Sequence, residues 1–188
     1  MEAFLTSTVM VAVAEMGDKT QLLSFVLAAR FRKPWPIVLG ILLATLANHF
    51  LAGALGTWIA SLVSPATLKW IIALAFFAFG LWALRPDELE ENPTMPAAGV
   101  FFTTLVAFFL VEMGDKTQLA TVALAARYDS LAAVVLGTTL GMVIANAPAV
   151  WMGERLAHRV NMRYMRWVAA ALFMVLGVVT LLAWGRAG

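Results

Sequence analysis

The sequence predicts an all-α integral membrane protein whose six transmembrane helices form two inverted repeats of three helices. Composition is the first sign: of 188 residues, 62% are hydrophobic and only 13% are charged, whereas a soluble domain is about 45–50% apolar. Six apolar stretches each approach or exceed the roughly 20 residues that a helix needs to cross a bilayer. The third sign is an internal duplication at a constant offset of 97 residues, since 112 − 15 = 97.

The apolar spans are separated by prolines, charged residues and short polar turns. They are expected at roughly 3–29, 35–63, 66–84, 98–126, 131–153 and 165–185. The chain then divides into repeat 1 (1–84), an acidic cytoplasmic loop (85–97) and repeat 2 (98–188), which together form one transmembrane domain. The first span follows no basic n-region, so we expect it to be a retained helix and not a cleaved signal.

An odd number of helices in each repeat determines their relative orientation. If all six spans cross, repeat 2 enters the bilayer from the side opposite to repeat 1, and the halves become inverted repeats, as in many transporters. Eight loop arginines and lysines lie on one predicted side and three on the other. The positive-inside rule places the first side in the cytoplasm, so both termini are predicted outside.

An octapeptide inside the first span recurs without change inside the fourth. Glu15–Leu22 reads EMGDKTQL, and so does Glu112–Leu119. Charged side chains at this depth cost about 2.5–3.5 kcal/mol each on insertion scales. Four carboxylates and two lysines therefore indicate a site that handles ions, although buried Glu–Lys pairs could also act as structural contacts between helices.

The motif and its surroundings are rich in oxygen. On a continuous helix Glu15 and Asp18 would share a face, as would Glu112 and Asp115. Gly17 and Gly114 would allow either close helix packing or a local break of the helix. Neutral side chains add amide and hydroxyl groups, and these are Thr20, Gln21, Thr117, Gln118, Asn48 and Asn146.

Oxygen donors favour a hard divalent cation such as Mn²⁺, Ca²⁺ or Mg²⁺. Four carboxylates and two lysines leave a charge of −4 + 2 = −2, which one divalent ion would balance. The carboxylates could instead hold protons, and a site that holds either is the minimum for an antiporter. Lys19 and Lys116 each follow a glutamate by four residues, so an ion pair within the helix is expected. No resident cofactor is predicted; the metal ion and protons are substrates.

Three further features have mainly structural interpretations. Met16 and Met113 are expected to fill space beside the site, with a thioether ligand that would favour Mn²⁺ as the alternative. His49 is expected to be a buried histidine with satisfied hydrogen bonds, with a proton relay as the alternative. Gly137 and Gly141 form a GxxxG pattern that predicts close packing inside the fold, although an oligomer formed through small-residue faces stays open.

The sequence is also compatible with functions other than cation exchange. A small exporter of cationic amino acids could have the same six-helix plan, with Lys19 or Lys116 binding the substrate carboxylate. A channel and a non-transporting membrane structural or assembly protein are further alternatives. The chain has no cysteine, no HExxH motif and no Ser/His/Asp arrangement, so we expect no enzyme. A net charge of +2 without a basic patch does not suggest nucleic-acid binding.

The duplicated Glu-x-Gly-Asp-Lys-Thr resembles the signature of a six-helix membrane family once known as uncharacterised protein family 0016. That family includes Golgi calcium/manganese transporters, chloroplast manganese transporters and bacterial manganese exporters. The resemblance implies export of Mn²⁺ or Ca²⁺ in exchange for protons. It implies Glu15, Asp18, Glu112 and Asp115 as metal ligands, supported by Thr20, Gln21, Thr117 and Gln118. Eukaryotic members carry targeting extensions, so the resemblance favours a bacterial inner-membrane protein.

Overall fold

The computed structural model describes residues 1–85, 99–152 and 162–183, and all regular structure in these ranges is helical. The predicted all-α fold is therefore confirmed. Most of the acidic loop predicted at 85–97 lies outside the described residues. The helices are α1 (Glu2–Glu15), α2 (Lys19–Phe31), α3 (Pro34–Leu62), α4 (Pro65–Ala83), α5 (Val100–Glu112), α6 (Lys116–Arg127), α7 (Leu131–Met152) and α9 (Met162–Ala183).

Each of the spans predicted at 3–29 and 98–126 consists of two helices, α1 and α2 in the first and α5 and α6 in the second. The breaks fall at residues 16–18 and 113–115, which we call the motif breaks. Gly17 has φ 87° and Gly114 has φ 76°, a conformation that costs other residues energy because of their Cβ atom. Of the two roles considered for these glycines, a local break is the one the structure has.

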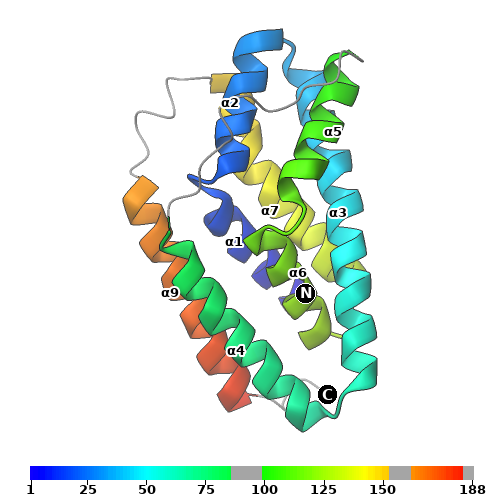
Figure 1. The fold of residues 1–188 in the computed structure, drawn as a ribbon, viewed down its shortest axis with the longest axis vertical. Coiled ribbons are helices and arrows are strands. Elements are labelled where there is room, and N and C mark those ends of the chain that lie inside the picture. The colour runs from blue at the N-terminus through cyan, green and yellow to red at the C-terminus, as the bar shows by residue number, and fades with distance from the viewer. Residues whose placement is uncertain (86–98, 153–161, 184–188) are drawn as a thin grey trace.

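Successive spans alternate in direction along the long axis, with α1 and α2 forming one span and α5 and α6 another (Figure 1). In this view α1 and α2 ascend, α3 descends and α4 ascends, whereas α5 and α6 descend, α7 ascends and α9 descends. Three described helices are long and apolar enough to cross a membrane, namely Pro34–Leu62, Pro65–Ala83 and Leu131–Met152. Crossing by all six predicted spans stays a prediction.

The two repeats make equivalent contacts with each other. A Cβ atom on Gly40 in α3 would lie 3.0 Å from the carbonyl oxygen of Phe101 in α5. A Cβ atom on Gly137 in α7 would lie 2.5 Å from the carbonyl oxygen of Phe4 in α1. Residues 40 and 137, and residues 4 and 101, are separated by the same offset of 97. The duplication seen in the sequence therefore extends to the packing between the repeats, because α5 packs on α3 as α1 packs on α7.

The GxxxG glycines are part of this internal packing. Gly141 lies one turn after Gly137, and its Cβ would meet the carbonyl oxygen of Thr8 at 2.6 Å. The predicted role of the pattern in packing inside the fold is confirmed. Because this face is covered by α1, it does not offer a surface to a second copy of the chain.

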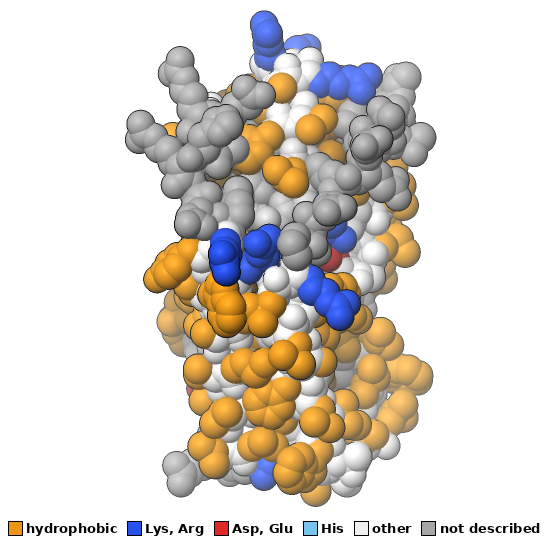
Figure 2. Space-filling view, turned by 60° about the vertical axis from the view of Figure 1, so that its left-hand side comes forward, with side chains coloured by type: hydrophobic (Ala, Val, Ile, Leu, Met, Phe, Trp, Pro, Cys, Tyr) orange, Lys and Arg blue, Asp and Glu red, His pale blue; other side chains and the backbone are white. Residues whose placement is uncertain are grey.

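The pair α4 and α9 packs beside the broken helices and presents an apolar outer surface. Phe76 and Phe79 of α4 meet Phe173 of α9 at centroid distances of 6.5 and 5.9 Å. Outward from this contact, large apolar side chains such as Leu74 and Leu182 are exposed, and hydrophobic side chains cover much of this face (Figure 2). Such a surface suits contact with lipid chains and not with water.

Candidate cation site

The motif breaks bring the two octapeptides together in the interior. α1 and α5 end at Glu15 and Glu112, while Asp18 and Asp115 are the N-cap residues of α2 and α6. Both aspartates have extended backbones, with φ −88° and ψ 170° at Asp18. Each glutamate therefore projects from a helix end and each aspartate from a following helix start, so the expectation that they share one helix face is wrong.

All four carboxylates are buried. The exposed fractions are 0% for Glu15 and Glu112, 1% for Asp18 and 2% for Asp115. One carboxylate oxygen each of Glu15, Glu112 and Asp115 lie within 4.8 Å of one another. Ca²⁺ ligands at about 2.3–2.6 Å would lie about 5 Å apart across the ion. The three side chains can therefore share one cation, and Asp18 lies outside this group.

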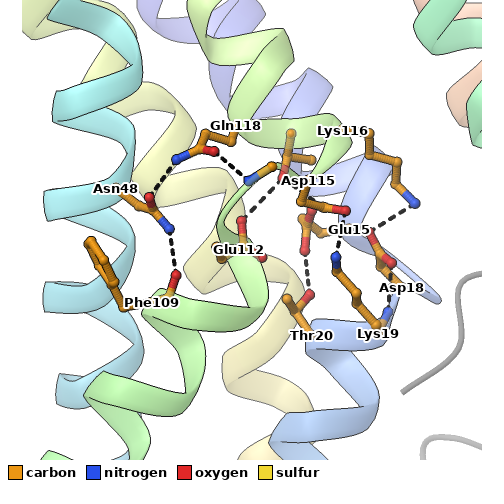
Figure 3. A network of polar contacts seen from close by, with 12 residues as sticks. Glu15, Asp18, Lys19, Thr20, Asn48, Phe109, Glu112, Asp115, Lys116 and Gln118 are labelled. Atoms are coloured by element: carbon orange, nitrogen blue, oxygen red, sulfur yellow. Dashed lines mark hydrogen bonds and ion pairs between the residues drawn. The ribbon is translucent and has the colours of Figure 1, made fainter. Parts of the chain in front are cut away.

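The lysines pair across the two repeats, and not along their own helices. Lys19 Nζ lies 2.9 Å from Asp115 Oδ1, and Lys116 Nζ lies 2.9 Å from Asp18 Oδ2. We call these two contacts the crossed ion pairs (Figure 3). The expected pairing of each lysine with the glutamate four residues earlier is wrong, because the motif break turns the start of the second helix away from the end of the first.

The two glutamates each keep one oxygen without a donor. Thr20 Oγ1 donates to Glu15 Oε2, and Thr117 Oγ1 donates to Glu112 Oε2 at 3.3 Å. The remaining atoms, Glu15 Oε1 and Glu112 Oε1, are buried and have no hydrogen-bond partner among the described residues. A buried carboxylate oxygen without a partner is costly, so these two atoms mark where a cation or a proton would be most stabilised.

Gln21 and Gln118 tie the motif breaks to the neighbouring repeat. Gly17 N–H donates to Gln21 Oε1 at 3.0 Å, and Gln21 Nε2 donates to the carbonyl oxygen of Ala145 at 3.0 Å. In the second repeat Gly114 N–H donates to Gln118 Oε1 at 2.7 Å, and Gln118 Nε2 donates to Asn48 Oδ1 at 2.6 Å. Each glutamine thus holds its own break against a long helix of the other half.

The two asparagines take different roles. Asn48 Oδ1 receives Gln118, and Asn48 Nδ2 donates to the carbonyl oxygen of Phe109 at 3.0 Å. Asn146 Oδ1 instead receives Ser24 Oγ at 2.9 Å. The offset of 97 aligns Asn48 with Ala145, whose main-chain oxygen takes the equivalent place in the other half. Sequence inspection pairs the asparagines by their preceding alanines and misses this exchange of a side chain for the backbone.

His49 and Met113 have environments that differ from those expected from the sequence. His49 is fully buried, and both of its ring nitrogens lack a hydrogen-bond partner among the described residues. The expectation of a histidine with satisfied hydrogen bonds is therefore wrong. Met113 is 57% exposed, so the expectation that it fills space beside the buried carboxylates is wrong. The grouped donors in the site are carboxylate oxygens.

The positive φ at Gly114 gives a direct test of the motif break. Gly114→Ala should lower the free energy of unfolding by about 1–2 kcal/mol, because only the backbone is strained and the new Cβ would meet nothing within 4 Å. Gly114→Asn should lose less. Thermal unfolding of the purified protein in detergent measures both.

Gly99→Ala is the matched control, since Gly99 has φ 84° and also an open surrounding. Gly99→Ala should lose a similar amount of stability and keep its affinity for the metal. Gly114→Ala should lower both the stability and the affinity for the metal. Unchanged stability of Gly114→Ala would contradict the need for a left-handed residue at this break.

A family model and individual proteins match this chain over most of its length. The chain matches the family described as "Divalent cation/proton antiporter GDT1" over residues 3–91 and 100–187. A protein of Vibrio cholerae serotype O1 named "Putative manganese exporter" is 46% identical over 181 residues, covering 96% of this chain and 90% of that protein. "GDT1-like protein 5" of Arabidopsis thaliana is 29% identical over 222 residues, covering 97% and 96% of the two chains. No solved structure matches this chain.

Proposed function

Since the chain belongs to the GDT1 family of divalent cation/proton antiporters, we propose that it exports a divalent cation from the cytoplasm in exchange for protons. Mn²⁺ is the first proposed substrate and Ca²⁺ the second. The relative named as a manganese exporter supports this order. We place the protein in a bacterial inner membrane with both termini outside, because loop arginines and lysines are concentrated on the other side.

The observation that carries the proposal is the group of buried carboxylates at the motif breaks. Glu15, Glu112 and Asp115 can offer oxygens to one ion, and the two glutamates each have a free oxygen. Protons entering from outside would occupy the same free oxygens and displace the metal. One set of atoms that accepts either substrate, but not both, is the minimum that cation/proton exchange requires.

The proposed motion uses the duplication. The two halves run in opposite senses (Figure 1) and meet at the motif breaks, so rocking one half against the other would expose the carboxylates to each side in turn. Asp18 is held by Lys116 and, unlike Asp115, lies outside the group of carboxylates whose oxygens can share one ion in this conformation. We assign it as a ligand only in a conformation where that contact is broken.

Export of cationic amino acids has less support from the site. That function needs a cation to bind the substrate's carboxylate, and the candidates were Lys19 and Lys116. Both are already paired with aspartates at 2.9 Å, so neither is available in this conformation.

Proton flux in proteoliposomes tests the proposed function. The purified protein is reconstituted with a pH-sensitive dye inside, and Mn²⁺, Ca²⁺, Mg²⁺ or lysine is added outside in turn. We expect a saturable proton flux with Mn²⁺ or Ca²⁺. A flux driven by lysine alone would move the protein to the amino-acid exporters, and a flux that neither saturates nor couples to the pH gradient would indicate a channel.

A further inference from the structure

Each lysine of the motif is committed to the aspartate of the other repeat. Lys19, at the start of α2, reaches the N-cap of α6, and Lys116, at the start of α6, reaches the N-cap of α2, both at 2.9 Å. Figure 3 shows the two contacts side by side next to Glu15. The arrangement is reciprocal, so it belongs to the duplicated design and not to one helix.

The aspartate oxygens are also occupied on their other sides. Asp18 Oδ1 accepts the main-chain N–H of Lys19 at 2.6 Å, and Asp115 Oδ2 accepts Thr117 Oγ1 at 3.3 Å. The glutamates, in contrast, have no cationic partner within ion-pair distance among the described residues, and each has a free oxygen. Two of the four negative charges are therefore compensated inside the protein, and two remain for the substrate.

We propose that Lys19 and Lys116 act as fixed counter-ions that limit how tightly the site holds its cation. This inference rests on the proposed function. Four uncompensated carboxylates around one divalent ion in a buried site would bind it strongly, since attraction grows as the local dielectric constant falls. A transported ion must bind well enough to enter and weakly enough to leave. Because the lysines neutralise the aspartates, the charge of the bound cation is balanced by the two glutamates.

The two lysines should not contribute equally. The side chain of Lys116 is 3% exposed, whereas that of Lys19 is 21% exposed. Water screens the charge of Lys19 more than that of Lys116. Loss of the Lys116 charge should therefore change cation affinity more than loss of the Lys19 charge.

Calorimetric titration of the detergent-purified protein with Mn²⁺ tests this role. We expect Lys116→Met to bind Mn²⁺ at least about tenfold more tightly than the wild type, because Asp18 becomes an uncompensated charge beside the site. Transport at saturating Mn²⁺ should fall, since the ion leaves more slowly. Lys116→Arg should keep wild-type affinity, and Lys116→Met/Asp18→Asn, which removes both charges, should return affinity to within a few fold of it. Lys69→Met is the control for losing a lysine far from the site.

A lysine that only stabilised the fold would behave differently. Its loss would leave Mn²⁺ affinity unchanged or lower it, and either result would overturn the inference. If Lys116→Met fails to fold without metal, Lys19→Met gives the same test at the less buried pair, with a smaller increase in affinity expected. Thermal unfolding adds an independent readout, because the stabilisation by Mn²⁺ should be larger in either variant than in the wild type.

The wild-type titration separates the two levels of the argument. Absence of Mn²⁺ and Ca²⁺ binding to the wild type would overturn the proposed function together with this inference. Wild-type binding without tightening in the lysine variants would overturn only the role of the lysines.

Discussion

Glu15→Gln and Glu112→Gln are each expected to abolish proton-coupled cation transport while the protein still folds. Both carboxylates are fully buried, and each has one oxygen without a hydrogen-bond partner among the described residues. When the cation is bound, each glutamate forms a buried ion pair with it. Removing one charge from such a pair costs about 3–5 kcal/mol, which corresponds to a hundredfold or greater loss of affinity for the cation. Proton flux driven by Mn²⁺ in proteoliposomes, measured for each variant, gives the result.

Folding must be measured beside transport in these variants. Glutamine keeps the size of glutamate and removes a buried charge that has no cationic partner, so stability without metal should be equal to that of the wild type or higher. Glu2→Gln is the control, since Glu2 is exposed and contacts Tyr128 at 3.2 Å. Wild-type flux in either site variant would remove the glutamates from the proposed site.

Gly56→Ala is expected to give the largest loss of stability among single-methyl changes in the long helices. A Cβ atom at this position of α3 would lie 2.2 Å from the carbonyl oxygen of Val122 and 3.0 Å from its carbonyl carbon. Backbone of α6 cannot move aside without moving the whole helix, so we expect a cost of about 3 kcal/mol, the upper end for overpacking. Because α6 begins at Lys116, transport should fall as well.

Gly177→Ala provides the comparison. Its Cβ would meet the ring of Phe77 at 2.5 Å, but an aromatic side chain can rotate where a backbone carbonyl cannot. The loss of stability should therefore be clearly smaller, as measured by thermal or denaturant unfolding in the same detergent. Equal losses in the two variants would mean that α3 and α6 are less closely fixed than the structure indicates.

Much of the fold follows from local pattern. Apolar stretches between breakers predicted where helices lie. The offset of 97 predicted a duplicated unit, and the structure repeats contacts at the same offset, such as those of Gly40 and Gly137. The family resemblance inferred from Glu15–Thr20 and Glu112–Thr117 is confirmed by the family match. The sequence left open whether Gly17 and Gly114 serve close packing or a break, because apolar content cannot distinguish a continuous helix from one that a glycine at positive φ interrupts.

The sequence by itself determined that two copies of one acidic motif lie inside an apolar helical protein, because hydropathy and repetition are properties of the chain alone. Only the tertiary structure decided how the charges are shared. Whether Lys19 meets Glu15 or Asp115 depends on where the other repeat lies, and that position is set by the packing of α1 on α7 and of α3 on α5 and α6. The distinction between paired aspartates and open glutamates therefore comes from contacts between the halves, which no local pattern encodes.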